Sequence, residues 1–289
     1  MKKKLISGLL ISAMVLTMAG CGSSSSSDSS DSSSTTEDTS SEDTASTSSD
    51  DSSESDVDYI KDKGTLTVGV TDFAPMDYKD DNGDWIGFDA DLAKKVGESL
   101  GVDVEFVEID WDSKILELEN KSIDVVWNGM TLTDEVTSSM ECTNAYLKNA
   151  QVVVVPKDKA DDYSTEESLS DLNFAVETGS AGEEAAKEAG LTYNSVESQA
   201  NALLEVKSGV SDACIIDLLM AGAMIGEDTD FADFTYTVEL TSEEYGIGCR
   251  KGSDLAEYIN EELKSYQDDG SLETLATQYG VQESLIDLE

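Results

Sequence analysis

The sequence predicts an α/β protein whose folded part forms two lobes, each built on a mostly parallel sheet flanked by helices. Short β-branched or apolar runs alternate with segments in which apolar residues recur at helical spacing, as is typical of α/β units. This alternation runs once up to residue 155 and starts again at residue 173. A run of four valines, 152–155, lies between the two blocks and predicts a strand that crosses from one lobe to the other.

The first block contains four predicted strands and two predicted helices. The predicted strands are residues 66–70, 102–107, 123–127 and 151–155, and the predicted helices are 88–100 and 115–119. The first helix has apolar residues at 88, 92, 96 and 100, and Gly101 follows as a stop signal.

The second block repeats the pattern and ends in two helices. Its predicted strands are residues 173–176, a short one near Tyr193, 213–216 and 245–250. Its predicted helices are 182–189, 199–208, 218–225, 254–267 and 271–279. Strands that alternate with helices of this length favour parallel sheets covered by helices.

The composition excludes several classes of function. The 289 residues include 62 Asp plus Glu, 18 Lys plus Arg and no histidine, which gives a net charge of −44. So acidic a chain is repelled by nucleic acid phosphates. Without histidine, Ser-His-Asp triads and His-ligated metal sites are impossible. We also expect no cofactor and no metal, because no calcium-loop spacing occurs.

Residues 1–21 predict a lipoprotein signal peptide. Three lysines at 2–4 precede an apolar run at 5–16, which is too short to span a membrane. A cysteine, Cys21, stands directly after Ala19-Gly20, and this arrangement resembles a bacterial lipobox. We therefore expect cleavage before Cys21 and a thioether-linked lipid on its sulfur; an ordinary signal peptide with a chance cysteine is the alternative.

Residues 22–56 predict a disordered tether. This Ser/Asp-rich segment has no basic and no large apolar residue, so it cannot bury enough surface to offset its chain entropy. The net charge divides into +3 for 1–21, −10 for 22–56 and −37 for 57–289. The sequence thus predicts a soluble, monomeric module that is lipid-anchored on the extracytoplasmic face of the cell membrane.

Several motifs then occur in a characteristic order. They are Val68-Gly69-Val70-Thr71-Asp72-Phe73-Ala74-Pro75-Met76, Gly87-Phe88-Asp89-Ala90-Asp91-Leu92-Ala93, Asp110-Trp111-Asp112, Gly129-Met130-Thr131-Leu132-Thr133, Val176-Glu177-Thr178-Gly179-Ser180, Asp212-Ala213-Cys214-Ile215-Ile216-Asp217 and Tyr245-Gly246-Ile247-Gly248. Together they resemble the polar amino acid family of ABC-transporter solute-binding proteins, bacterial extracellular solute-binding family 3, in its lipoprotein form.

The resemblance implies a periplasmic-binding-protein type II fold, in which two lobes joined by two hinge strands close on a small ligand. Lobe 1 would comprise residues 57–151 and 240–289, and lobe 2 residues 152–239. The implied partners are an amino acid or similar small polar ligand and an ABC permease in the membrane.

The candidate ligand-binding residues follow the ends of predicted strands, because ligands of open α/β sheets bind at the carboxyl ends of the strands. They are Asp72, Phe73, Trp111, Asn128, Gly129, Thr131, Gly179, Ser180, Ala181 and Asp217.

Each recognition role has a structural alternative. The segment 179–182 opens a helix and suits a carboxylate, although Ser180 also fits an ordinary N-cap. Asp217 ends an apolar strand and suits an ammonium group, although it could instead cap the next helix. Phe73 and Trp111 match family positions that clamp the ligand, although both could be core residues. Trp127 lies inside a predicted strand, and this position favours a packing role over ligand binding.

One position departs from the family. Where the family places an arginine that grips the ligand carboxylate, this sequence has Val136 or Glu135, and its only arginine is Arg250, in a predicted turn. The anion site then depends on backbone N–H groups, on hydroxyls of Thr131, Thr133 or Ser180, or on a lysine such as Lys148. Otherwise the ligand has no anionic end. We therefore expect neutral or cationic solutes rather than anionic ones.

The sequence predicts a binding protein that captures an amino acid or related solute and delivers it to a permease, and not an enzyme. Two alternatives remain. One is a sensor module for a signalling partner, and the other is a small dehydratase-type enzyme on the same scaffold. The acids Asp72, Asp110, Glu177 and Asp217 could support acid–base chemistry in that case.

Overall fold

The computed structural model describes residues 55–288, and the predicted signal peptide, Cys21 and most of the predicted tether lie outside this range. The first helix, α1 (Asp56–Lys63), begins at the last residue of the predicted tether, and Ser55 caps it. Asp56 therefore belongs to the folded part. Within the described part of the chain, no helix is both long and apolar enough to span a membrane.

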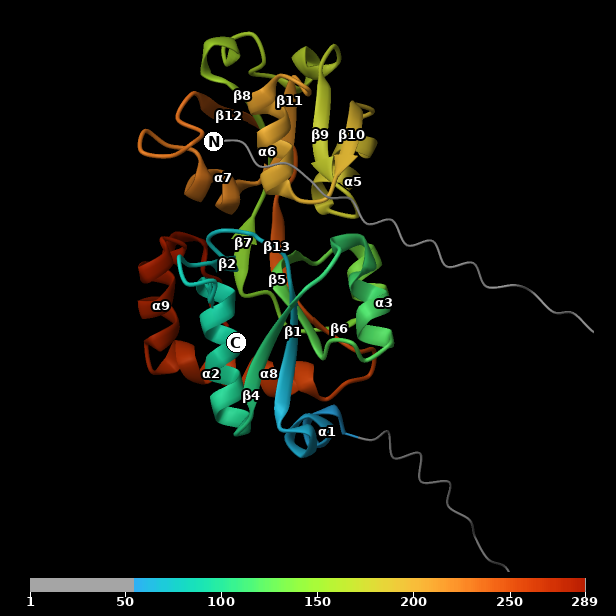
Figure 1. The fold of residues 1–289 in the computed structure, drawn as a ribbon, viewed down its shortest axis with the longest axis vertical. Coiled ribbons are helices and arrows are strands. Elements are labelled where there is room, and N and C mark those ends of the chain that lie inside the picture. Colours follow the sequence, from blue (N-terminus) through green and yellow to red (C-terminus); the bar gives the residue numbers. More distant parts are fainter. Residues whose placement is uncertain (1–54, 289) are drawn as a thin grey trace, which may run out of the picture. The chain divides into compact units, whose positions relative to one another are not determined.

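The first lobe is built on a six-stranded sheet (Figure 1). Its strands are β1 (Thr65–Val70), β4 (Asp103–Glu108), β5 (Val125–Thr131), β6 (Glu141–Cys142), β7 (Leu147–Asn149) and β13 (Glu243–Cys249), and a small hairpin adds β2 (Tyr78–Lys79) and β3 (Trp85–Ile86). Its helices are α1, α2 (Phe88–Leu100), α3 (Lys114–Glu119), α4 (Asp134–Ser139), α8 (Leu255–Asp268) and α9 (Ser271–Tyr279). Short 3-10 helices occur at Trp111–Ser113 and Gln282–Ser284.

The second lobe is built on a five-stranded sheet. Its strands are β8 (Gln151–Pro156), β9 (Asn173–Glu177), β10 (Thr192–Val196), β11 (Ala213–Asp217) and β12 (Phe234–Glu239). Its helices are α5 (Ala181–Glu188), α6 (Gln199–Ser208) and α7 (Leu218–Met224), with 3-10 turns at Lys157–Lys159 and Glu166–Leu169. The predicted two-lobed α/β class is thus confirmed.

Each sheet is mixed rather than mostly parallel. In the first, β1 pairs in parallel with β4 and β5, whereas β13 pairs antiparallel with β5, β6 and β7. In the second, β9 pairs in parallel with β10 and β11, whereas β8 pairs antiparallel with β11 and β12. The antiparallel halves contain the strands that enter from the other lobe, β8 and β13.

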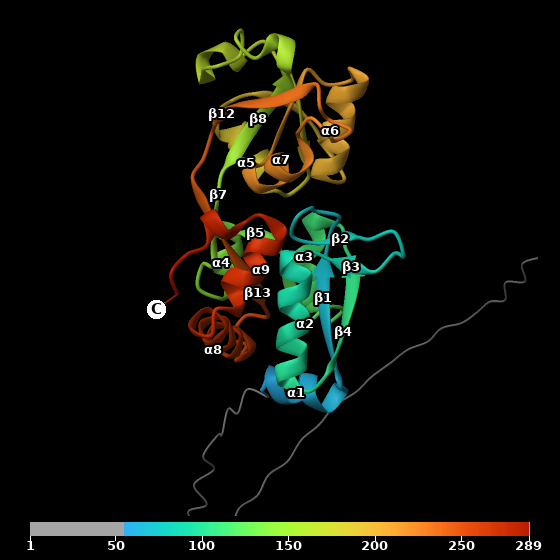
Figure 2. The same ribbon diagram turned by 90° about the vertical axis from the view of Figure 1, so that its left-hand side faces the viewer.

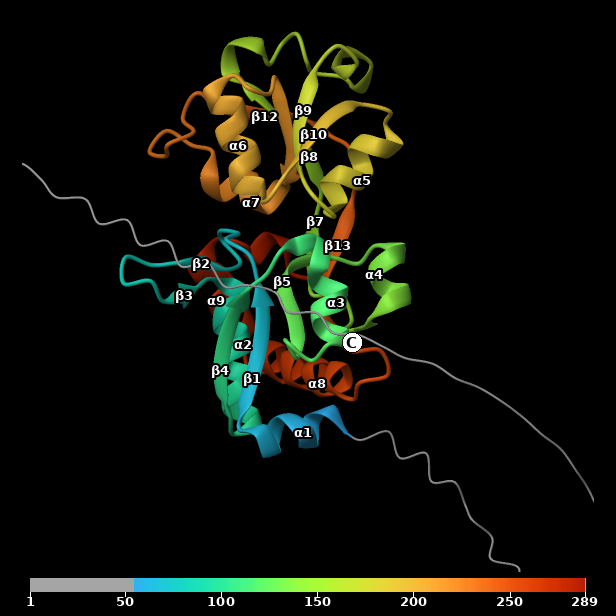
Figure 3. The same cartoon turned by 45° about the vertical axis from the view of Figure 1, so that its right-hand side comes forward.

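The chain crosses between the two sheets twice, near the labels β7 and β13 in Figure 3. The first crossing is Ala150, between β7 and β8, and the second is 240–242, between β12 and β13. The valines predicted to cross therefore lie wholly within the second sheet, in β8.

Helices cover both faces of each sheet, and this explains the uninterrupted apolar strands. In β8, Val152 and Val154 pack on the side of α6 and α7, whereas Val153 and Val155 pack on the side of α5. In the first lobe, one face packs against α2, α8 and α9, which lie close together in Figure 2, and the other against α3 and α4.

Arg250, the only arginine of the chain, ties the first lobe together. Its Nε and Nη2 donate to the Asp56 carboxylate at 3.0–3.2 Å, and its Nη2 also donates to Asp124 at 3.3 Å. Its Nη1 donates to the carbonyl oxygen of Ile123 at 2.9 Å. This guanidinium therefore serves the fold and lies apart from the site described next.

Candidate functional site

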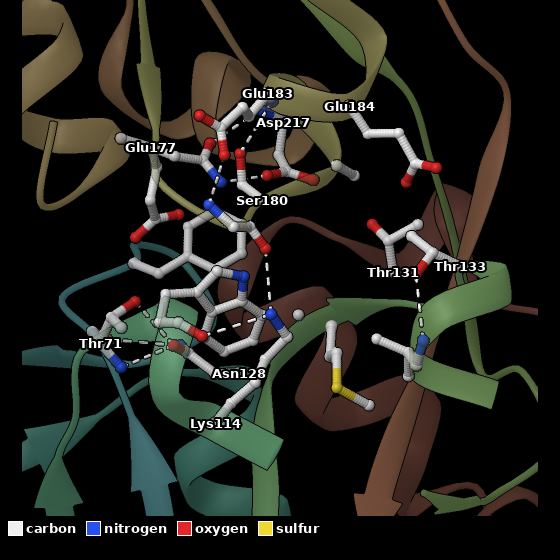
Figure 4. Close-up of a pocket in the computed structure, with 18 of the residues that line it drawn as sticks. Thr71, Lys114, Asn128, Thr131, Thr133, Glu177, Ser180, Glu183, Glu184 and Asp217 are labelled. Carbon is white, nitrogen blue, oxygen red and sulfur yellow. Dashed lines mark hydrogen bonds between the residues drawn. The ribbon is translucent and has the colours of Figure 1, made fainter. Parts of the chain in front are cut away.

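A cavity of about 360 Å³ is lined by loops from both lobes (Figure 4). The first lobe contributes the segments that follow β1 and β4, the end of β5 and the start of α4. The second lobe contributes the segment between β9 and α5, the start of α6 and the end of β11. These segments lie mainly at the carboxyl ends of parallel strands, where ligands of open α/β sheets bind.

Most of the residues predicted to bind ligand line this cavity. They are Phe73, Trp111, Asn128, Gly129, Thr131, Gly179, Ser180, Ala181 and Asp217. Asp72 does not line it. It borders a second hollow beside Glu108 and Asp110, because the chain bends at Asp72 and Phe73 is the residue that lines the cavity.

Asp217 is the most heavily hydrogen-bonded acid of the cavity wall. Its Oδ1 accepts from Asn149, from Gln151 Nε2 at 3.0 Å and from the Tyr245 hydroxyl at 2.6 Å, and its Oδ2 accepts from Gln199. Its side chain makes no capping bond to α7, so helix capping is not its role. Because a carboxylate offers about four acceptor positions, Oδ2 keeps room for one more donor.

Glu177, at the end of β9, is a second buried acid of this wall, with 4% of its surface exposed. Among the described residues, no donor reaches its buried Oε1. Burial and then the charge of Asp217 raise the pKa of Glu177 to about 8, although the neighbouring Gln199 amide lowers it in part. This acid was predicted only as a possible catalytic group, and it lines the cavity.

Glu243 connects Asp217 to both crossings between the lobes. The side-chain amides of Asn149 and Gln151, which flank the first crossing, donate to Asp217 and also to Glu243 Oε1, at 2.7 Å each in the latter case. Glu243 itself begins β13, directly after the second crossing. Burial and then the charge of Glu243 raise the pKa of Asp217 to about 7. Glu243 was not predicted from the sequence, because its contacts join residues far apart in the chain.

Lys114 is the buried cation of the cavity wall. It begins α3, directly after the 3-10 turn that carries Trp111, and its ammonium lies 4.9 Å from the centre of the Trp111 ring. Nζ donates to the carbonyl oxygen of Gly179 at 3.0 Å and to that of Trp111 at 3.3 Å. Burial lowers its pKa, and Glu135, Glu177 and Asp112 offset this only in part. Its place three residues after Trp111 is the sequence signal that could have revealed it.

The segment that opens α5 combines a cap and a cavity wall. The Ser180 hydroxyl accepts from Glu183 N at 3.1 Å, and the Gly179 N–H donates to Glu183 Oε2 at 2.8 Å. Ser180 is therefore an N-cap, and the capping serine also lines the cavity. Gly179 has φ 71°, and a side chain there would lie 2.8 Å from Asp112 of the other lobe, so this close approach requires glycine.

Asn128 and Gly129 are held by buried acids beneath the cavity. Asn128 Oδ1 accepts from the Thr71 N–H at 2.6 Å and its Nδ2 donates to Asp77 at 2.8 Å, while the Gly129 N–H donates to Asp89 at 2.7 Å. Neither Asp77 nor Asp89 lines the cavity. The Asn128 side chain is thus committed to fixing the shape of the loop.

The two predicted aromatic clamps, Phe73 and Trp111, are both buried and both line the cavity. Phe73 packs edge-on against Tyr245, with ring centroids 6.4 Å apart. Trp111 packs in the apolar cluster that contains Val136. Each ring is therefore a core residue with one edge in the cavity wall, whereas Trp127 is fully buried and is a packing residue.

Val136, at the position where the family resemblance implies an arginine, lines the cavity from α4. Of the predicted substitutes for that arginine, Thr131, Thr133 and Ser180 line the cavity, whereas Lys148 is exposed on β7 and does not. The Thr131 hydroxyl donates to Glu243 at 2.8 Å, and the Thr133 hydroxyl caps α4 by accepting from Val136 N.

The cavity wall is acidic overall. Its ionisable side chains are the acids Glu135, Glu177, Glu183, Glu184 and Asp217 and the bases Lys114 and Lys187. In residues 55–288 no group of three or more Cys, Asp or Glu side chains is arranged to hold a metal ion.

Comparison with known proteins identifies the relatives. Residues 66–282 match the family described as bacterial extracellular solute-binding proteins, family 3. The arginine-binding extracellular protein ArtP of Bacillus subtilis is 32% identical over 223 residues, which are 74% of this chain and 85% of ArtP.

Two solved structures illustrate the range of the fold. An ABC uptake transporter substrate-binding protein from Streptococcus pneumoniae with bound histidine is 27% identical, with a TM-score of 0.74 over 81% of this chain and all of that one. The ancestral amino acid-binding protein AncCDT-1, a precursor of cyclohexadienyl dehydratase, is 35% identical, with a TM-score of 0.71 over 78% of this chain and 99% of that one.

Proposed function

Because the chain belongs to family 3 of the bacterial extracellular solute-binding proteins, we propose that it is the solute-binding lipoprotein of an ABC importer. It captures an amino acid or related small polar solute between its two lobes and delivers it to a permease. The signal peptide, the lipid on Cys21 and the tether before residue 55 place it on the outer face of the cell membrane in this proposal.

The observation that carries the proposal is a cavity walled by both lobes in which buried acids keep free acceptor capacity. Asp217 takes the ammonium group of the solute on Oδ2, and Glu177 lies in the same wall with an unpaired oxygen. The excess of acids over lysines supports neutral or cationic amino acids, and the relation to an arginine-binding protein agrees with this preference.

Capture follows from closure of the lobes. A solute that contacts both lobes stabilises the closed arrangement relative to any open one, because only the closed arrangement offers all of its contacts. The contacts of Asp217 with Asn149 and Gln151 connect the ammonium site to the first crossing, and the bond from Thr131 to Glu243 connects the cavity to the second. These bonds link occupancy of the cavity to the segments that bend.

A thermal-shift screen of the purified full-length chain against the twenty amino acids, their α-amides and simple amines tests this function. We expect at least one neutral or basic amino acid to raise the melting temperature reversibly, and aspartate and glutamate to have no effect. Mass spectrometry should recover the solute unchanged. Absence of stabilisation by every amino acid would refute the proposal.

A dehydratase-type activity is the second candidate, and two observations favour keeping it. Glu177, with its pKa raised to about 8, can hold a proton at neutral pH inside the cavity, and AncCDT-1 is a precursor of a dehydratase. Formation of a dehydrated product at many turnovers per protein molecule would favour this candidate, whereas stoichiometric recovery of the intact solute favours binding.

A further inference from the structure

Lys114 stands out among the lysines because it is buried without a counter-ion. Only 5% of its surface is exposed, and among residues 55–288 it forms no ion pair, whereas Lys63, Lys79, Lys94 and Lys264 each pair with an acid. Its two acceptors are neutral carbonyl oxygens, and an ammonium group has three N–H donors. One donor is therefore left without a hydrogen-bond acceptor, and the residue lines the cavity.

Burying a charge is costly unless an opposite charge neutralises it. The acids that act to raise the pKa of Lys114 are Glu135, Glu177 and Asp112. None of them forms a hydrogen bond with its Nζ. Glu177 shows the complementary situation, because its buried Oε1 has no donor among the described residues. The cavity wall therefore holds a buried lysine and a buried carboxyl group that do not pair with each other.

We infer that Lys114 binds the carboxylate of the captured solute, in place of the arginine that the family carries at the position of Val136. This inference rests on the proposed function and assigns the anion-binding residue of that site. The carboxylate lies toward the first lobe, on Lys114, and the ammonium group lies toward the second lobe, on Asp217. A zwitterion held in this way touches both lobes and favours their closure.

The positions of Lys114 and Val136 support the inference that Lys114 takes the role of the arginine. Lys114 and Val136 both belong to the first lobe and line the same cavity, so a lysine at 114 can supply charge where residue 136 supplies none. Figure 4 shows the Lys114 side chain reaching from the first lobe toward the loop of Ser180, where its Nζ meets the Gly179 oxygen. The same loop opens α5, whose free N–H groups can share the carboxylate.

A different role for Lys114 would be a latch between the lobes, through its bond to Gly179. A latch stabilises the closed lobes around any solute, so its loss lowers the affinity for every solute by the same factor. A carboxylate-binding residue instead distinguishes an amino acid from its α-amide, which has the same shape and no carboxylate charge. The ratio of the two affinities separates the roles.

The test is isothermal titration calorimetry on the full-length chain with L-arginine, L-lysine, L-histidine and L-glutamine, each beside its α-amide. The variants are Lys114→Met, which keeps the length without the charge, Lys114→Arg, which keeps the charge, and the control Lys148→Met, on an exposed lysine outside the cavity. Circular dichroism and thermal melting verify that each variant folds.

In the wild type we expect the preferred amino acid to bind at least about tenfold more tightly than its α-amide, as for a hydrogen bond between charged groups. Lys114→Met should bring this ratio of affinities close to one, because it weakens binding of the amino acid but not of its α-amide. Lys114→Arg should restore most of the ratio, and Lys148→Met should leave it unchanged.

An unchanged ratio in Lys114→Met, or an equal loss for acid and amide, overturns the assignment while leaving the proposed function in place. Absence of binding by these four and, in the thermal-shift screen, by every other amino acid to the folded wild type overturns the proposed function and the assignment together.

Discussion

The first lobe holds two cations in opposite ways, the half-buried Arg250 and the buried Lys114. The Arg250 guanidinium is bonded to Asp56, Asp124 and a carbonyl oxygen. Burial acts to lower its pKa, but the two acids outweigh burial and the pKa is raised. At Lys114 burial lowers the pKa, and no acid is close enough to reverse the effect. The protein supplies the counter-ions of Arg250, whose charge serves the fold; it supplies none for Lys114, and we propose that this charge pairs with a ligand.

The largest expected effect is the loss of stability when Arg250 is replaced. Arg250→Met should lower the free energy of unfolding by about 3–5 kcal/mol, because it leaves Asp56 and Asp124 without their main partner. Urea unfolding measures the loss, and solute affinity should not change. Lys79→Met, which breaks an exposed pair with Glu108, is the control and should cost at most about 1 kcal/mol. A similar loss in both variants would contradict the structural role of Arg250.

The next effect concerns the acid that faces Lys114 across the cavity. Asp217→Asn should weaken binding of the preferred amino acid by about tenfold to a hundredfold, because the ammonium group loses a charged acceptor. Calorimetry measures this change, and the exposed Asp212→Asn, just before the same strand, is the matched control. Wild-type affinity in a folded Asp217→Asn protein would remove Asp217 from the ammonium site.

A smaller effect is expected when charge is added beside Lys114. Val136→Arg places a guanidinium on a residue that already faces the cavity, so amino acids should bind a few-fold to about tenfold more tightly. Their α-amides should show no such gain. If no amino acid gains affinity, residue 136 does not reach the carboxylate, and the alignment of that loop with the family is wrong.

The smallest effect is a change of stability with pH. Glu177 has a pKa near 4.5 when unfolded and about 8 in the fold, so the native state holds the extra proton between these values. Unfolding free energy should therefore fall as the pH rises from 5 to 8, with a contribution of the same sign from Asp217.

Glu177→Gln should remove part of this slope. The variant should match the wild type near pH 5 and exceed its stability at pH 8 by about 1 kcal/mol or more, since each pKa unit corresponds to about 1.4 kcal/mol. Urea unfolding at both pH values tests this, with the exposed Glu188→Gln as control. An identical slope in Glu177→Gln would show that its buried carboxyl is not protonated in the fold.

The sequence predicted the main strands and helices and nine residues of the cavity wall, because both depend on local pattern. Hydrophobic spacing located those elements but not α1, α4, β12 or the short strands β2, β3, β6 and β7, and the rule that ligands bind at strand ends located Asn128, Gly179 and Asp217. Asp72 was predicted to line the cavity and does not, because packing decides the direction of a single side chain in the short segment after β1. The antiparallel halves of the sheets escaped prediction because strand direction depends on how the chain enters each lobe.

The residues that were missed share a physical reason. Gln199 and Glu243 stand at the starts of a helix and a strand, and only the folded chain brings them to Asp217. Lys114 begins a helix, where a lysine is ordinarily a surface residue. Its burial and its lack of a counter-ion are properties of the assembled lobes, and no local pattern records them.

The most direct test of the account is a crystal structure of the chain with whichever of L-arginine, L-lysine, L-histidine or L-glutamine binds most tightly. We predict the amino acid in the cavity between the lobes, with a carboxylate oxygen within hydrogen-bonding distance of Lys114 Nζ and its ammonium group on Asp217. A carboxylate bound away from Lys114, with the lysine still bonded only to carbonyl oxygens, would contradict it.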